Sequence, residues 1–287
     1  MKLSKIGTMI LAALVGLSAH VAQAFDCDTT MTQSGDWDTD GNWDGGTPTS
    51  SDNACIDTGV TATVASEDTD AICENLWIKS TAKIVVESPR TLSIVGTGTS
   101  ELDDDIELQR GATLDLVNCP TIEGDGGKIT GLSTGSGDPA VILADNDAIL
   151  TGVGGTEGTS LVVEGYLDIQ GRIDNNAFVV ANDPQGALTL SDQNKLGSGM
   201  WIARNGATLS VGVLVSGSAG WEMIHDEDSK IHFHTANSTG LTGDFEITNG
   251  TLDIDVNVTT TGSLLFYSDE ASHPRIEVAS GKVAIFD

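Results

Sequence analysis

Apolar and polar residues alternate along most of this chain, in pairs of short segments joined by a brief turn. Each segment reads apolar-x-apolar, which is the period-two pattern of a β-strand with one buried face. The turns are rich in Gly, Asn or Asp, which accept the positive φ of a tight corner. Four clear copies are Ile106–Leu116, Leu161–Ile169, Met200–Val211 and Phe245–Ile254. The pattern predicts an all-β protein built from one repeated unit.

The spacing of the repeat favours one all-β architecture over another. From Val141 onward the copies recur about every 20 residues, which is a period typical of stacked solenoids. A sandwich or barrel of antiparallel hairpins is the alternative, since short Asn-Gly turns suit hairpins. In a parallel β-helix each coil buries the apolar face of its neighbour, which explains a sustained period. We therefore predict a single-stranded right-handed parallel β-helix, or β-solenoid, of about 10 coils.

The N-terminal residues read as a Sec-type secretory signal peptide. Lys2 and Lys5 precede an apolar stretch, Ile6–Val21, and Ala22–Ala24 matches an A-x-A cleavage site. We expect a secreted or cell-surface protein whose mature chain begins at Phe25, and an uncleaved N-terminal anchor is the alternative. No later stretch is long and apolar enough for a membrane-spanning helix, so we expect no integral membrane association. The predicted organisation is a signal peptide (1–24), a polar N-terminal cap segment (25–52) and a parallel β-helix (53–287).

The charge of the chain limits the classes of molecule that it can bind. The formal net charge is −29 at pH 7, from 42 acidic and 13 basic residues. Such a surface repels nucleic acid and other polyanions, so no nucleic-acid partner is expected. It favours solubility in saline or calcium-rich surroundings. A second copy of the chain and a surface glycan are the partners left open.

Four cysteines lie in the first half of the chain, and they are Cys27, Cys55, Cys73 and Cys119. An even count in an exported protein predicts two disulfides, with three possible pairings. Cys55 and Cys73 stand about one repeat apart, which would place them on adjacent coils. A metal site is the less favoured alternative, because there is no C-x-x-C pair. We expect the cysteines to stabilise the N-terminal end of the solenoid.

A longer motif stands just before the first coil. The segment 35–56 reads GDWDTDGNWDGGTPTSSDNACI. It resembles the lead-in motif of secreted bacterial β-solenoid proteins, including autotransporter passenger-like proteins, in which a W…W-x-x-G-x-P…D-x-A-x-I block precedes the first coil. The later segments GATLDL, GATLSV and GTLDI are similar to the coils of the same group. The resemblance implies export and a β-solenoid fold. It carries over no catalytic residue, and the autotransporter's membrane barrel does not follow the repeats.

The lead-in motif also contains a candidate calcium loop. Asp38, Asp40, Asn42 and Asp44 place oxygen ligands at every second position, as Ca²⁺ loops do. The EF-hand pattern is not met, because Trp43 stands where that loop needs Gly. A polar turn ahead of the first coil is the alternative. The sequence demands no cofactor, and Ca²⁺ is the one that it suggests.

Two histidines form a second candidate metal site. His232 and His234 share one face of a predicted strand if Ile231 and Phe233 point inward. Two imidazoles at this spacing can bind a transition metal. Surface residues without a ligand are the alternative.

The repeat runs to the last residues, where Val283, Ile285 and Phe286 form a final strand. An uncovered coil exposes unpaired strand edges and apolar side chains, so we expect these three residues to bind a second copy, for example head to tail in a filament. The function predicted is that of a non-enzymatic structural or adhesive protein of the cell surface or biofilm matrix. The alternatives are a carbohydrate-active β-helix enzyme, either a polysaccharide lyase or a hydrolase, and a monomeric Ca²⁺- or glycan-binding module. An enzyme needs long loops around a cleft, and the repeats after residue 141 look too short to carry them.

Overall fold

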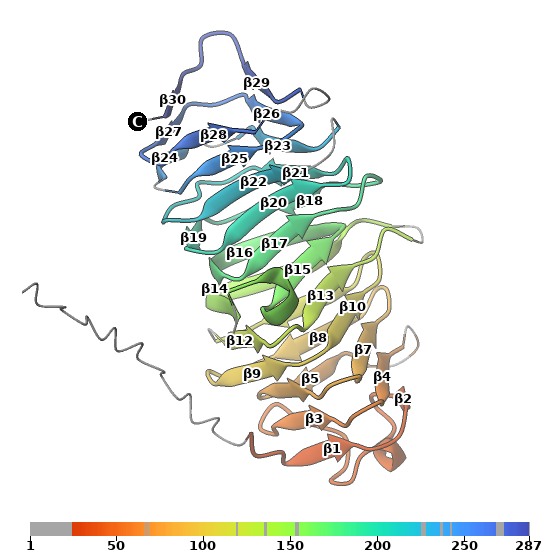
Figure 1. Ribbon diagram of the computed structural model, residues 1–287. Helices are drawn as coiled ribbons and strands as arrows, with labels where there is room; N and C mark the ends of the chain where they lie inside the picture. The colour runs from red at the N-terminus through yellow and green to blue at the C-terminus, as the bar shows by residue number, and fades with distance from the viewer. Residues whose placement is uncertain are drawn as a thin grey trace, which may run out of the picture.

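The strands of this protein stack in parallel as the coils of a solenoid (Figure 1). The computed structural model describes residues 25–65, 67, 69–118, 120–134, 137–152, 155–224, 228–235, 238–241, 243–267 and 273–286. The predicted signal peptide, residues 1–24, lies outside these described residues. One sheet holds 11 strands, one for each coil, so the predicted parallel β-helix of about 10 coils is confirmed.

Each coil contributes short strands to three faces, which we number in chain order. The first face holds β1 (Thr29–Met31), β3 (Ala54–Ile56), β6 (Leu76–Ile78), β9 (Thr99–Leu102), β12 (Thr121–Gly124), β19 (Lys195–Gly197), β24 (Ser238–Leu241), β27 (Val258–Thr260) and β30 (Ala284–Phe286). The second face holds β2 (Gly35–Asp36), β4 (Thr61–Val64), β7 (Lys83–Val86), β10 (Asp105–Leu108), β13 (Lys128–Gly131), β15 (Val162–Gly165), β17 (Phe178–Ala181), β20 (Met200–Arg204), β22 (Gly220–Ile224), β25 (Phe245–Ile247) and β28 (Leu264–Phe266).

The third face holds β5 (Ala71–Cys73), β8 (Thr91–Ile94), β11 (Thr113–Leu116), β18 (Leu188–Leu190), β21 (Thr208–Val211), β23 (Lys230–Phe233), β26 (Thr251–Ile254) and β29 (Arg275–Val278). Two longer strands, β14 (Ala140–Gly152) and β16 (Leu167–Asn176), run along the third face and continue onto the first, because they pair with strands of both. Two 3-10 turns, η1 (Asp40–Asn42) and η2 (Glu157–Thr159), lie outside the sheets.

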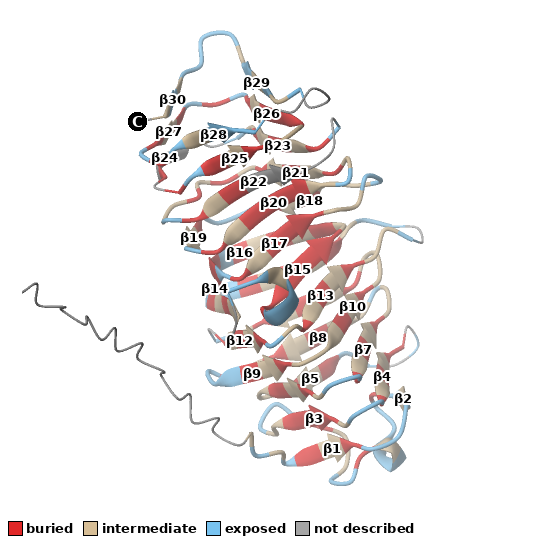
Figure 2. Ribbon diagram, viewed as in Figure 1, coloured by how far each residue is buried: buried red, intermediate tan, exposed pale blue. Residues whose placement is uncertain are grey.

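Buried residues recur on the strands of every coil (Figure 2), and their inward side chains form apolar columns that run through the coils. On β11, Leu114 and Leu116 are fully buried while Thr113 and Asp115 face outward. The register then places one buried apolar residue above another from coil to coil. One such column on the third face consists of Leu92, Leu114, Ile142, Ile169, Leu190, Val211, Phe233 and Ile254. Each such side chain contributes about 1.5–3 kcal/mol on burial, so the columns supply much of the stability.

The corners between the second and third faces have the geometry that the turn residues predicted. Gly111, Gly206 and Gly250 have φ values of 78°, 76° and 99°, and Asn205 has a φ of 59°. These positions join the two halves of the repeat, which are both strands as expected.

The N-terminal segment closes its end of the solenoid. β1 and β2 already stack on β3 and β4, so the first coil begins inside the segment predicted to be only a cap. Trp37 and Trp43 are buried and pack edge to face, with ring centroids 4.9 Å apart. Trp43 also forms an antiparallel bridge with Met31 on β1, so the chain itself covers that strand edge.

One disulfide joins this cap to the first complete coil. Cys27 and Cys55 are bonded, with their Cα atoms 5.8 Å apart. The sequence left three pairings open, and Cys55 does not pair with Cys73, because Cys55 lies opposite Trp77 on the first face and Cys73 lies on the third. Cys73 is a buried free thiol, and burial raises its pKa to about 12. Cys119 lies outside the described residues.

The longest coil departs from the predicted spacing. Lys128 and Val162 are neighbours in the register, yet 34 residues separate them. Part of the extra length lies between β13 and β14, and the rest forms an excursion between β14 and β15 that contains η2, which lies beside β15 (Figure 1). This excursion begins after residue 141, where the repeats were expected to be too short for the long loops of an enzyme cleft.

Gly171 gives a direct test of the coil packing. Its φ is 73°, and a Cβ there would overlap the carbonyl of Ala144 in the coil below. We expect Gly171→Ala to lower the free energy of unfolding by at least about 2 kcal/mol in urea denaturation. Gly41→Ala is the control, because no heavy atom lies within 4 Å of a Cβ there, and it should change stability by less than about 0.5 kcal/mol. Equal losses in the two variants would contradict this packing.

Candidate functional site

Of the two histidines predicted to bind metal, His232 lies on the outer face of β23 and His234 directly follows that strand. Ile231 and Phe233 are buried while His232 and His234 are partly exposed, so the predicted shared face is confirmed. Their ring centroids are 5.0 Å apart.

The next coil adds two carboxylates that sequence spacing did not reveal. His232 pairs in register with Asp253, and its Nε2 lies 3.0 Å from Asp255 Oδ2 and 3.9 Å from Asp253 Oδ2. Among the described residues, these are the three His, Cys, Asp or Glu side chains whose ligand atoms all lie within 4.8 Å of one another. We call them the His232 cluster. The register, rather than proximity in sequence, assembles it.

His234 is oriented by different partners. Its Nε2 lies 2.9 Å from Ser210 Oγ, and its Nδ1 lies 2.7 Å from Thr235 Oγ1. Burial lowers the pKa of His234, the nearby His232 lowers it further, and Asp255 acts in the opposite direction. The two imidazoles therefore direct their Nε2 atoms at different groups, which does not match the predicted two-histidine ligand pair.

The predicted calcium loop folds as part of the N-terminal cap. Asp40 Oδ1 accepts hydrogen bonds from the Thr47 backbone NH and hydroxyl, which lower its pKa. Asp44 Oδ1 accepts one from the Thr30 NH at 2.7 Å, and the Asn42 amide donates to a backbone carbonyl of β2. The loop's carboxylates do not converge within 4.8 Å as a group of three. Ca²⁺ binding at this loop stays a prediction.

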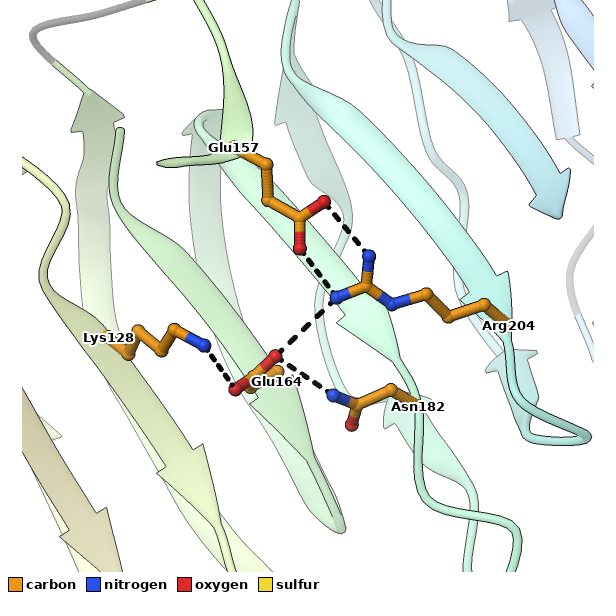
Figure 3. Close-up of polar contacts among 5 residues, drawn as sticks. All are labelled: Lys128, Glu157, Glu164, Asn182 and Arg204. Atoms are coloured by element: carbon orange, nitrogen blue, oxygen red, sulfur yellow. Dashed lines mark hydrogen bonds and ion pairs between the residues drawn. The ribbon is translucent and has the colours of Figure 1, made fainter. Parts of the chain in front are cut away.

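A network of charged residues crosses the outside of the second face (Figure 3). Glu164 on β15 accepts a hydrogen bond from Lys128 Nζ at 3.0 Å and one from Asn182 Nδ2 at 2.9 Å. Arg204 Nη2 lies 3.8 Å from Glu164 Oε2. The Arg204 guanidinium also holds Glu157 of η2 by two hydrogen bonds of 2.9 and 2.5 Å. The residues come from four coils and from the excursion, so sequence alone did not group them.

This network anchors the excursion over a small apolar cluster. Val162, Val180 and Ile202 are buried on the outward side of the second face, apart from the main core. Each carboxylate of the network faces a cation, which is typical of a structural clamp. A hydrolase pair instead keeps one carboxyl protonated as general acid.

A buried lysine is the first residue of β19, directly after the corner that joins β18 to β19. Lys195 Nζ donates hydrogen bonds to the backbone carbonyls of Gly171, Ser191 and Gln193. Burial lowers its pKa to about 8, although Asp192 and Asp168 act in the opposite direction. The lysine thus supplies donors to two carbonyls of the turn before β19 and to one of β16 in the coil below. The adjoining hollow of 470 Å³ is lined by Arg172, Gln193, Asn194, Leu196 and Ser216, none of which is a carboxylate.

The strands of the last described coil are exposed or only partly buried, pale blue or tan in Figure 2, and we call this coil the open C-terminal coil. In the register of the described residues, β28 pairs with β25, β29 with β26 and β30 with β27, and no strand follows them. All the exposed large apolar residues that the structure describes lie here: Leu265, Phe266, Tyr267, Val278, Val283 and Ile285. Val283 and Ile285 are exposed as predicted. Phe286 instead packs edge to face on Phe245, at 5.6 Å.

The chain matches no protein-family model, and no significant match is found among curated proteins or solved structures. The resemblance to secreted bacterial β-solenoid proteins therefore stays a prediction from motif residues. Within the described part of the chain, no helix is both long and apolar enough to span a bilayer.

The network around Glu164, which holds the excursion, should contribute measurably to the stability of the protein. The Glu164 side chain is 11% exposed and bonded to two neighbours, so we expect Glu164→Gln to cost about 1–3 kcal/mol of unfolding free energy. Glu107→Gln is the control, because Glu107 pairs with Lys83 on the same face but is 27% exposed. That change should cost less than about 1 kcal/mol. If Glu107→Gln lowers the free energy of unfolding as much as Glu164→Gln does, the Glu164 network contributes no more than an ordinary surface ion pair.

Lys195 should leave a signature in the pH dependence of stability. Its folded pKa of about 8 lies below the ordinary 10.5, so the native state releases a proton at a pH where the unfolded chain keeps it. Stability therefore rises with pH in this window. Relative to Lys195→Met, the wild type should gain about 2–3 kcal/mol between pH 7 and pH 10 in urea titrations. A constant difference between the two proteins would show that the lysine titrates normally.

Proposed function

We propose that this protein is an extracellular structural or adhesive β-solenoid that associates with a second copy through its open C-terminal coil. The main support for this proposal is that β28, β29 and β30 each have an unpaired edge at one end of the solenoid, together with exposed apolar side chains. Strand edges bind other strands through main-chain hydrogen bonds, and the apolar residues add burial. The coil stacking that builds the solenoid would then continue into the partner.

The capped N-terminal end favours one mode of association. Trp43 covers the edge of β1, and Trp37 closes the core beneath it. A head-to-tail filament needs an open face at both ends, whereas a tail-to-tail dimer uses the C-terminal end twice. The proposal is therefore a two-fold dimer, with strands of the two copies antiparallel across the junction.

Charges on β29 suit this two-fold arrangement. Arg275 and Glu277 face outward on either side of Ile276, which packs against the core. If two β29 strands pair antiparallel about Ile276, each Arg275 faces the partner's Glu277. Opposite charges directly across an antiparallel pair are stabilising.

The extracellular part of the proposal rests on one disulfide and on the net charge of the chain. The Cys27–Cys55 disulfide suits an oxidising compartment, where such bonds persist. The high negative charge suits a soluble protein in saline surroundings. The polar clusters bond within the solenoid itself, which supports a non-enzymatic role.

Charge reversal tests the dimer. Arg275→Glu places like charges opposite each other at two symmetry-related positions, so we expect dimerisation to weaken about tenfold in analytical ultracentrifugation. The double variant Arg275→Glu/Glu277→Arg restores the complementary pairs and should recover wild-type affinity. Thr58→Lys changes an exposed residue far from this end and is the control.

Two results would overturn the proposal. A wild-type protein that stays monomeric up to the highest soluble concentration has no self-association to explain. Filaments in electron microscopy would show head-to-tail stacking instead of the two-fold dimer.

A further inference from the structure

We propose that the His232 cluster binds one divalent first-row transition-metal ion between two adjacent coils. The ligands are His232 Nε2 from β23 and one carboxylate oxygen each from Asp253 and Asp255 of the following coil. This site is separate from the open C-terminal end and does not depend on the proposed dimer.

The distances match what such an ion needs. Ligand atoms about 2.0–2.2 Å from a tetrahedral metal lie about 3.3–3.6 Å from one another. His232 Nε2 lies 3.0 Å from Asp255 Oδ2 and 3.9 Å from Asp253 Oδ2. Small side-chain rotations therefore suffice to close the site. The paired strands β23 and β26 hold two of the ligands in register, so the backbone needs no rearrangement.

The donor set selects the class of metal. An imidazole with two carboxylates suits Zn²⁺ and its first-row neighbours. Ca²⁺ and Mg²⁺ prefer all-oxygen ligand sets, so they should bind poorly here. The Asp255 side chain is 49% exposed, so water or an added ligand can reach the remaining coordination position.

Two residues beside the site, Lys230 and His234, should affect metal binding in different ways. Lys230 Nζ lies 3.0 Å from Asp253 Oδ2 and competes with a cation for that carboxylate. Removing its charge should therefore tighten metal binding. His234 engages Ser210 and Thr235 through its two ring nitrogens, so it should not be a ligand.

Isothermal titration of ZnCl₂ into the purified chain, in a metal-free and non-chelating buffer, tests the site. We expect one Zn²⁺ per chain, and His232→Asn and Asp255→Asn should each weaken binding at least about tenfold. Lys230→Met should bind more tightly, and His234→Asn should change affinity less than about threefold. CaCl₂ titrated in place of ZnCl₂ should give no saturable binding that depends on His232.

A second readout separates metal binding from folding. Co²⁺ added to the wild type should give visible d–d absorption that His232→Asn abolishes and His234→Asn retains. All four substituted residues lie on the outer face, so circular dichroism of the metal-free variants should match the wild type. If His232→Asn fails to fold, Asp255→Asn decides the question alone.

Three outcomes would overturn the proposal. These are equal Zn²⁺ affinity in the wild type and His232→Asn, loss of binding in His234→Asn as large as in His232→Asn, and no Zn²⁺ binding by the folded wild type.

Discussion

The in-register stacking of one coil on the next is the constraint on which the rest of this structure depends. A single coil has three short strands and no closed core, so it cannot bury its apolar residues alone. Parallel pairing with the coils above and below satisfies its backbone groups and places Leu92, Leu114 and Ile142 in one continuous column. Gly171 fits the same stack, since its backbone passes against the coil below.

The same register organises the outer surface. Side chains separated by about one coil in sequence become neighbours, and the Lys79–Asp57 and Lys83–Glu107 ion pairs are formed in this way. The His232 cluster follows the identical rule with different residues. Polar contacts on the outside of a solenoid therefore join residues of adjacent coils, in rows along its axis. A chemical site arises where such a row brings together side chains that suit one ligand.

Stacking also explains why the two ends differ. Every interior coil is covered on both sides, but a terminal coil has one side without a neighbour. At the N-terminal end the protein solves this with Trp37, Trp43 and the Cys27–Cys55 disulfide. At the other end the inward residues Phe266 and Val278 are still 49% and 43% exposed. The proposed dimer depends on this asymmetry and not on the repeat itself.

The alternation and the period of the repeat were enough to predict the fold, because a strand's two-residue period and the spacing of its copies are local properties. They also predicted the glycine corners and the shared face of His232 and His234. The sequence did not predict the cysteine pairing, the excursion with η2 or the contacts of Glu164. Nor did it predict that Asp253 and Asp255 are partners of His232. Which residues meet across coils depends on the exact length of each coil, and only the tertiary register decides that.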